Sequence, residues 1–214
     1  MVGLTDIALI LGALSGALYG LIFLQSQPSL SRSSVKTLPL ATLALLAWSA
    51  GAPWLLAAAL GLSALGDLSL SRTGERAFLL GLGAFLAAHL AYIAVFFAVF
   101  ELPSLYAQAL AMIIVVPIGL AAARLIVLYA PQDLRLAVGL YCFVISLMLL
   151  CALAVANQSL LLALGSILFV FSDFCLGFAL FRRADLSPGQ EKLFAHLVWW
   201  SYLGAQALLF WALV

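Results

Sequence analysis

The chain is a succession of apolar runs long enough to cross a lipid bilayer, and this succession constrains its fold more than any other feature. Hydrophobic residues make up 67% of the 214 residues and charged residues only 8%. Soluble domains carry about one quarter charged residues, and a membrane-spanning helix needs roughly 20 mainly apolar residues. The sequence therefore predicts an all-α, polytopic membrane protein.

Polar and turn-forming segments separate eight apolar runs. We predict a single transmembrane domain over residues 1–214, with helices at about 6–24, 35–50, 53–71, 77–100, 102–128, 134–156, 159–181 and 193–214. No basic segment precedes the first run, so we expect it to be an uncleaved helix and not a signal peptide.

The nine cations fall in or beside alternate connections between these runs. They follow the first, third, fifth and seventh runs, as Arg32, Lys36, Arg72, Arg76, Arg124, Arg135, Arg182, Arg183 and Lys192. Because Lys and Arg are enriched in cytoplasmic loops, we predict that these connections are cytoplasmic and that both termini are non-cytoplasmic. We expect a multi-pass protein of a bacterial inner (plasma) membrane.

Two aspartates lie inside apolar runs that otherwise avoid charge. Asp67 lies in the third run and Asp173 in the seventh, each three residues before a leucine, Leu70 or Leu176. A carboxylate in lipid costs about 2.5–3.5 kcal/mol on insertion scales, so both should face the bundle interior. They lie four helices apart, which fits two parallel four-helix repeats about an axis along the membrane normal and would bring the acids face to face.

Further polar residues in neighbouring runs indicate a polar cavity. His89 and Tyr92 lie one turn apart in the fourth run, Tyr202 and Gln206 one turn apart in the eighth, and Ser172 directly precedes Asp173.

Simpler interpretations of these polar residues stay open. Asp67 could instead extend along its helix toward Arg72 or Arg76. The imidazole of His89 could simply hydrogen-bond a neighbouring helix.

The order of these motifs resembles the lysoplasmalogenase family, also called YhhN-like, over essentially the whole chain. The resemblance rests on Gly66-Asp67-x-x-Leu70, Phe78-x-x-Gly81-x-x-Ala84-Phe85-x-x-Ala88-His89-x-x-Tyr92-x-x-x-Phe96, Ser172-Asp173-x-x-Leu176 and Tyr202-x-x-x-Gln206. The chain departs from the family at the first predicted cytoplasmic loop. Members often show Lys-Pro there, whereas Thr37-Leu38 separates Lys36 from Pro39 in this chain.

The resemblance implies an eight-helix membrane hydrolase. Such an enzyme cleaves the vinyl ether bond of lysoplasmalogen, an alkenyl lysophospholipid, and gives a fatty aldehyde and a glycerophosphodiester. It implies catalytic roles for Asp67 and Asp173, and substrate-binding or supporting roles for five other residues: His89, Tyr92, Ser172, Tyr202 and Gln206.

Paired acids suit this chemistry, because protonation of a vinyl ether carbon requires an acid. Two carboxylates that share a buried site do not both ionise easily. One member of an aspartate dyad would then hold a proton as general acid, while the ionised member stabilises the oxocarbenium ion. The sequence does not assign the two roles between Asp67 and Asp173.

Other functional classes fit parts of the pattern. A small transporter could use intramembrane aspartates for proton or cation coupling. A zinc hydrolase usually needs three protein ligands, and two histidines at different depths give little support for a metal site. We expect a lysophospholipid substrate and contact with membrane lipids, and we expect no cofactor or obligate protein partner. The net charge of +1 argues against nucleic acid as a partner.

Overall fold

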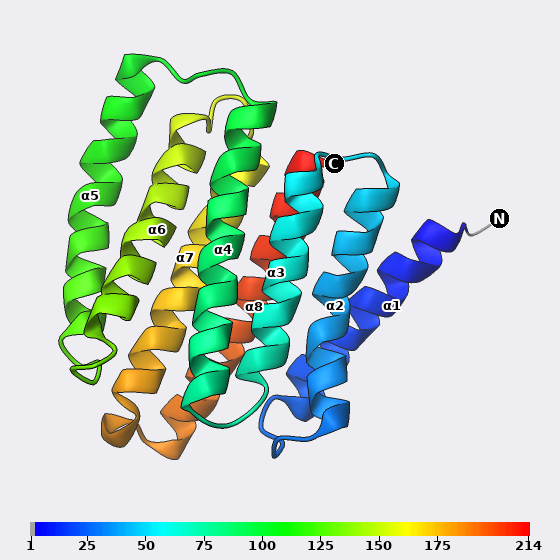
Figure 1. Ribbon diagram of the computed structural model, residues 1–214, viewed down its shortest axis with the longest axis vertical. Coiled ribbons are helices and arrows are strands. Elements are labelled where there is room, and N and C mark those ends of the chain that lie inside the picture. Colours follow the sequence, from blue (N-terminus) through cyan, green and yellow to red (C-terminus); the bar gives the residue numbers. More distant parts are fainter. Residues whose placement is uncertain (1–2) are drawn as a thin grey trace. The chain divides into compact units, whose positions relative to one another are not determined.

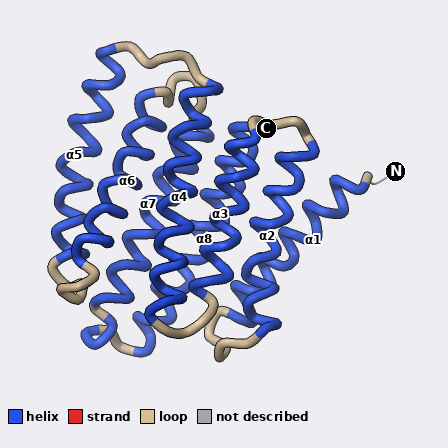
Figure 2. Tube along the Cα trace, in the orientation of Figure 1, coloured by secondary structure: helices blue, strands red, loops and turns tan. Residues whose placement is uncertain are grey.

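Eight α-helices follow one another along the chain in the computed structural model, which describes residues 3–214 (Figure 1). Their bounds are α1 Leu4–Leu18, α2 Leu30–Ser49, α3 Trp54–Leu70, α4 Glu75–Val99, α5 Leu105–Val127, α6 Arg135–Ala154, α7 Leu160–Phe181 and α8 Pro188–Leu213. A π-helix, Tyr19–Phe23, extends α1, and a short 3-10 helix, Arg183–Asp185, precedes α8. Figure 2 draws helices and loops, and no strand, in the described part of the chain.

The predicted all-helical architecture is confirmed, but two helix starts, those of α2 and α8, were each predicted five residues too late. α2 begins at Leu30 and not at residue 35, because the Ser29 hydroxyl caps it by accepting from the backbone N–H of Arg32 at 3.1 Å. α8 begins at Pro188 and not at residue 193, since proline fits the first helical position, where its missing N–H is not needed. Arg32 and Lys192 therefore lie on helices and not in connections.

Six helical segments are long and apolar enough to cross a membrane. They are Leu4–Phe23, Glu75–Val99, Leu105–Val127, Arg135–Ala154, Leu160–Phe181 and Pro188–Leu213. α3 is apolar but shorter, with 17 residues, and α2 carries Arg32 and Lys36 in its first half. The count of eight spans and the side on which the termini lie stay predictions.

The chain divides into two compact units, and the boundary falls within α4. The first unit extends through Val95 and also includes Leu213–Val214, and the second comprises Phe96–Ala212. The first unit thus holds α1 to α3 and most of α4, and the second holds α5 to α7 and nearly all of α8. The parallel repeat suggested by the sequence stays a prediction.

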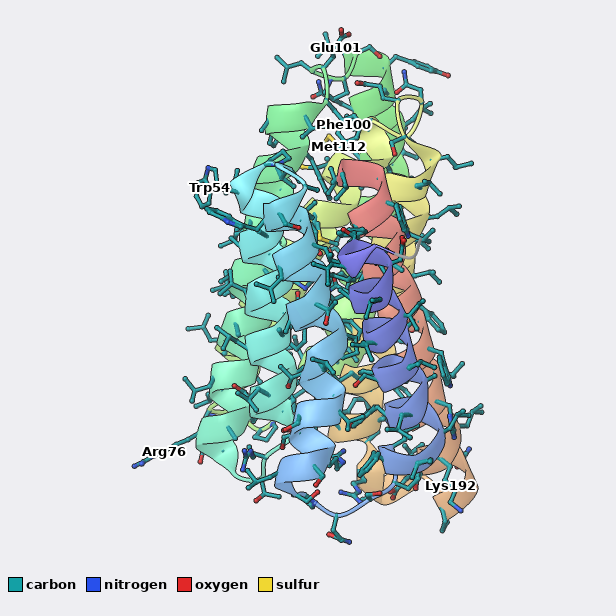
Figure 3. The ribbon with its side chains drawn as sticks, turned by 90° about the vertical axis from the view of Figure 1, so that its right-hand side faces the viewer. Trp54, Arg76, Phe100, Glu101, Met112 and Lys192 are labelled. Carbon is teal, nitrogen blue, oxygen red and sulfur yellow. The ribbon has the colours of Figure 1, made fainter. Side chains whose placement is uncertain are left out.

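In the first unit, α2 packs along α1 on one side and α3 on the other. The hydroxyl of Ser15 in α1 donates to the Val35 carbonyl of α2 at 2.9 Å, and the Ser71 hydroxyl donates to Ser33 at 2.7 Å. Figure 3 shows Trp54 and Arg76, near the starts of α3 and α4, at opposite ends of this unit. Polar contacts therefore tie α2 to both of its neighbours.

In the second unit, α6 packs against both of its neighbours in the chain, α5 and α7. The side-chain amide of Gln158 makes two hydrogen bonds to the backbone of Glu101, at 3.0 and 3.1 Å, and so joins the connections before α5 and before α7. Figure 3 places Glu101 and Lys192 at opposite ends of this unit. The ends are thus polar, while apolar helix faces occupy the length between them.

Candidate functional site

Asp67 forms an ion pair inside the first unit. Its carboxylate Oδ1 lies 3.2 Å from Nζ of Lys36, and the two side chains are only 2% and 14% exposed. The pair joins α3 to α2, two helices that pack along each other in this unit. A charged pair thereby lies buried between two packed helices, where Coulomb attraction is screened far less than in water.

The start of α2 adds a second cation near this pair, but protein acceptors occupy it. The guanidinium of Arg32 donates to the carbonyls of Phe23 and Ser71 at 3.2 Å each, and to the hydroxyl of Tyr19 at 3.0 Å. It also lies over the Tyr19 ring. Arg32 therefore holds the end of the π-helix, α2 and α3 together, one helical turn before Lys36.

The helix that carries Asp67 approaches α4 very closely. A Cβ atom built on Gly66 would lie 2.5 Å from the ring of Phe85, and one on Gly81 would lie 2.6 Å from Leu70. Only glycine allows this separation. The rotation of α3, and with it the direction of the Asp67 side chain, is consequently set by packing against α4.

Asp173 has a hydrogen-bond partner in the second unit. The hydroxyl of Tyr141, in the first half of α6, donates to Oδ2 of the carboxyl group in α7. The residue before it, Ser172, turns toward α8 and donates to the Val198 carbonyl at 2.9 Å. α7 thus presents adjacent polar residues to different neighbours, with Asp173 directed to α6.

The other sequence-predicted residues are buried in the unit to which each belongs. His89 and Tyr92 are fully buried on α4, in the unit that contains Asp67. Tyr202 and Gln206 are buried on α8, in the unit of Asp173, and the Tyr202 ring packs edge-on against Phe169. A single cavity lined by all seven predicted residues, and the aspartate dyad itself, stay predictions.

One buried hydroxyl on α7 lies two helical turns from Asp173 on the same face. Ser166 is 0% exposed, and its Oγ has no hydrogen-bond partner among the described residues. Buried polar groups are normally hydrogen-bonded. This face of α7 therefore carries a buried hydroxyl group without a described hydrogen bond, Ser166, as well as the carboxyl group of Asp173.

The residues that contact the two aspartates were missed by reasoning from the sequence. Lys36 was counted only as a cation beside the first connection, and the capping signal of Ser29, three residues before Arg32, was not used. Tyr141 lies in an apolar run, and no pattern around it distinguishes it from a packing residue. Within residues 3–214, no three His, Cys, Asp or Glu side chains gather as metal ligands would.

An all-helical chain with six bilayer-length apolar segments, and with charged or hydrogen-bonded aspartates inside its units, defines a multi-pass membrane protein. The model of the YhhN family matches residues 31–213, and the chain belongs to this family. The family resemblance predicted from the sequence is thereby confirmed.

Curated relatives are similar over most of this chain. It is 35% identical over 162 residues to a Mycobacterium bovis protein named lysoplasmalogenase, and equally to one of the same name from Mycobacterium tuberculosis. The alignment covers 73% of this chain and 58% of each relative, so the chain spans little more than half the length of these relatives. No solved structure is significantly similar.

Proposed function

We propose that this chain is a membrane hydrolase that cleaves the vinyl ether bond of lysoplasmalogen into a fatty aldehyde and a glycerophosphodiester. Its family and the name of the two mycobacterial relatives support this activity. The structural observation that carries the chemistry is a pair of aspartates, each engaged by a specific polar partner within apolar helices: Asp67 by Lys36, and Asp173 by Tyr141. A carboxylate among membrane-spanning helices is energetically unfavourable, and a catalytic role would explain why the chain carries two of them.

The reaction needs one acid and one molecule of water. A carboxylic acid protonates the β-carbon of the vinyl ether, which leaves an oxocarbenium ion and a carboxylate. Water adds to the cationic carbon and returns a proton to the carboxylate. The resulting hemiacetal loses its hydroxyl proton and breaks the carbon–oxygen bond to glycerol, and the alcohol oxygen takes up a proton. The acid is regenerated, so the net reaction consumes only water.

The aspartates are the groups proposed to act on the vinyl ether. Asp67 and Asp173 divide the roles of proton donor and anionic stabiliser of the oxocarbenium ion. Five residues bind the lysophospholipid or orient the acids: His89, Tyr92, Ser172, Tyr202 and Gln206. The substrate enters from the lipid phase of a bacterial plasma membrane, and its apolar chain stays among the apolar helix faces.

The test is aldehyde release from an alkenyl lysophospholipid by the full chain purified in detergent. Because general acid–base groups contribute about 10²–10⁴-fold, Asp67→Asn and Asp173→Asn should each lower turnover by at least a hundredfold. Asp133→Asn, at an exposed position between α5 and α6, is the matched control and should leave turnover unchanged. Full activity in both intramembrane variants would exclude catalysis by the carboxyl groups of Asp67 and Asp173.

Isotope incorporation tests the proton step directly. In deuterium oxide, protonation of the β-carbon places one deuterium on the carbon next to the aldehyde group. Unlabelled aldehyde would contradict the proposed mechanism. A transporter that used the aspartates for ion coupling would release no aldehyde in detergent at all, and that result would favour the alternative function.

A further inference from the structure

We infer that the N-terminal segment Leu4–Phe23, which comprises α1 and the π-helix, is a positioning element that holds Lys36 of α2 against Asp67 of α3. For its catalytic meaning the inference rests on the proposed function, in which Asp67 is one of the two acids. The family model matches the chain from residue 31 onward, so the N-terminal segment lies outside the matched region. The inference therefore assigns a role to a part of the chain that the family match does not include.

A proline interrupts the hydrogen-bond ladder of α2 three residues after Lys36. Pro39 is buried inside the helix and has no N–H, so the Val35 carbonyl cannot accept the bond that residue 39 would normally donate. A buried carbonyl without a partner is unfavourable. The part of α2 that carries Lys36 therefore depends on a donor from outside its own helix.

The preceding helix supplies this donor. The Ser15 hydroxyl of α1 donates to the Val35 carbonyl at 2.9 Å, and Val35 directly precedes Lys36 in the chain. In membrane helices, neighbouring helices and Ser or Thr side chains satisfy the backbone groups that proline frees. The bond from Ser15 thus compensates for Pro39 and also fixes the backbone next to Lys36.

The π-helix holds α2 at a second point, one turn before Lys36. The Arg32 guanidinium donates to the Tyr19 hydroxyl at 3.0 Å and to the Phe23 carbonyl at 3.2 Å. It also donates to the carbonyl of Ser71, at the C-terminal end of α3, at 3.2 Å. Arg32 therefore connects the N-terminal segment to both helices that carry the ion pair.

The contact between α1 and α2 is close and uses small residues. Gly12, Ser15 and Gly16 are the buried residues of α1, and a Cβ atom on Gly12 would lie 3.4 Å from the Thr42 side chain of α2. Small residues allow membrane helices to approach closely, and α1 packs along α2 (Figure 1). The close approach brings the Ser15 hydroxyl within hydrogen-bond distance of the α2 backbone.

Amine labelling measures whether Lys36 stays in place, independently of catalysis. The chain has two lysines: Lys36, whose side chain is ion-paired and 14% exposed, and Lys192, which is exposed and serves as an internal reference. The detergent-purified full chain is treated with a water-soluble acylating reagent, and mass spectrometry gives the labelling rate at each lysine. In the unmodified chain, Lys36 should be labelled more slowly than Lys192, and equal rates would overturn the inference.

Removal of either hydroxyl should weaken this protection. Ser15→Ala and Tyr19→Phe should each raise the labelling rate of Lys36 relative to Lys192 about two- to tenfold, the factor expected for one hydrogen bond. Ser26→Ala is the matched control, because Ser26 is exposed and donates to the Ile22 carbonyl of its own segment. Unchanged labelling of Lys36 in either hydroxyl variant would overturn the inference.

A change at Pro39 distinguishes positioning through the freed carbonyl from a general loss of packing. Pro39→Ala restores an N–H that can donate to the Val35 carbonyl within α2. In this background Ser15→Ala should no longer raise the labelling of Lys36, because the carbonyl already has a donor. An equal effect of Ser15→Ala in the two backgrounds would overturn the role assigned to the bond between Ser15 and Val35.

The kinetics of aldehyde release connect this positioning to catalysis. Because Ser15 and Tyr19 act through the ion pair and not on the substrate, Ser15→Ala and Tyr19→Phe should lower kcat about two- to tenfold and leave KM largely unchanged. Tyr106→Phe changes an exposed tyrosine and should have no effect. A higher KM with an unchanged kcat, or full activity despite faster labelling of Lys36, would overturn the catalytic part of the inference.

The two measurements separate this inference from the proposed function. If the unmodified chain releases no aldehyde, the proposed function is wrong and the catalytic part of the inference is overturned with it, while the labelling still decides whether the N-terminal segment holds Lys36. If aldehyde forms but the labelling of Lys36 does not respond to Ser15→Ala and Tyr19→Phe, the proposed function stands and the inference alone is overturned.

Discussion

In the first unit a buried aspartate contacts an ammonium group, whereas in the second unit an aspartate accepts a hydrogen bond from a phenol. The pair Asp67–Lys36 carries two opposite charges that depend on each other. The pair Tyr141–Asp173 joins a neutral donor to a carboxyl group. Two similar sequence motifs can thus give the same side chain a charged partner in one unit and a neutral hydrogen-bond donor in the other.

The two regions are nevertheless built on a common packing device. In each unit, the helix that carries the aspartate approaches the following helix through a glycine. A Cβ on Gly66 would lie 2.5 Å from the Phe85 ring, and one on Gly165 would lie 3.1 Å from the Ala205 carbonyl oxygen. The scaffold is therefore alike in the two regions, and the chemical difference comes from the helices that precede the aspartates.

Among the variants that test this comparison, removal of the Lys36 ammonium should have the largest effect on stability. We expect Lys36→Met to lower the free energy of unfolding by about 3–5 kcal/mol, since it removes the ammonium group that pairs with the buried Asp67 carboxylate. Thermal unfolding in detergent measures the change, and Lys192→Met, at an exposed position, should have little effect. A loss no larger than that of the control would mean that the charge pair contributes nothing to the first unit.

The shared packing device can be tested at Gly66. Gly66→Ala introduces a methyl group against the Phe85 ring, and overpacking of this kind costs about 1–3 kcal/mol. Gly61→Ala is the matched control, because a Cβ on Gly61, also in α3, would meet no atom within 4 Å. Equal stability of the two variants in thermal unfolding would show that α3 and α4 separate without penalty.

The phenol contact should contribute less to stability than the ion pair. Tyr141→Phe removes one hydrogen bond to Asp173 and no ion pair, so we expect a loss of about 0.5–1.5 kcal/mol. Unfolding of Tyr106→Phe, which changes an exposed tyrosine, gives the reference. If Tyr141→Phe destabilises the chain as much as Lys36→Met, the contrast between the two regions is wrong.

The smallest effect should come from the serine beside Asp173. Ser172→Ala removes the bond to the Val198 carbonyl, and hydrogen bonds between membrane helices average about 0.6 kcal/mol. Ser69→Ala, in the corresponding part of α3, removes only a bond to the carbonyl of Leu65 within its own helix and should change stability less. The reverse order would indicate that the α7–α8 contact does not depend on Ser172.

Much of the fold could be predicted from the sequence because the bilayer imposes a simple length rule on apolar runs. Every predicted run contains a helix, and the two late starts, at α2 and α8, occurred where polar residues continue into a helix. Hydropathy does not detect such polar first turns. Helix-start signals in the sequence do mark these turns: Ser29 caps the start of α2, and Pro188 occupies the first helical position of α8.

The candidate site was only half predictable. The sequence alone determined that the chain is helical and apolar, and that Asp67 and Asp173 interrupt its runs, because carboxylates are too costly in lipid to be accidental. Tertiary structure alone decided that Lys36 and Tyr141 contact them. These partners lie more than 30 residues from their aspartates along the chain, and only the rotation and close approach of packed helices determine which side chains meet.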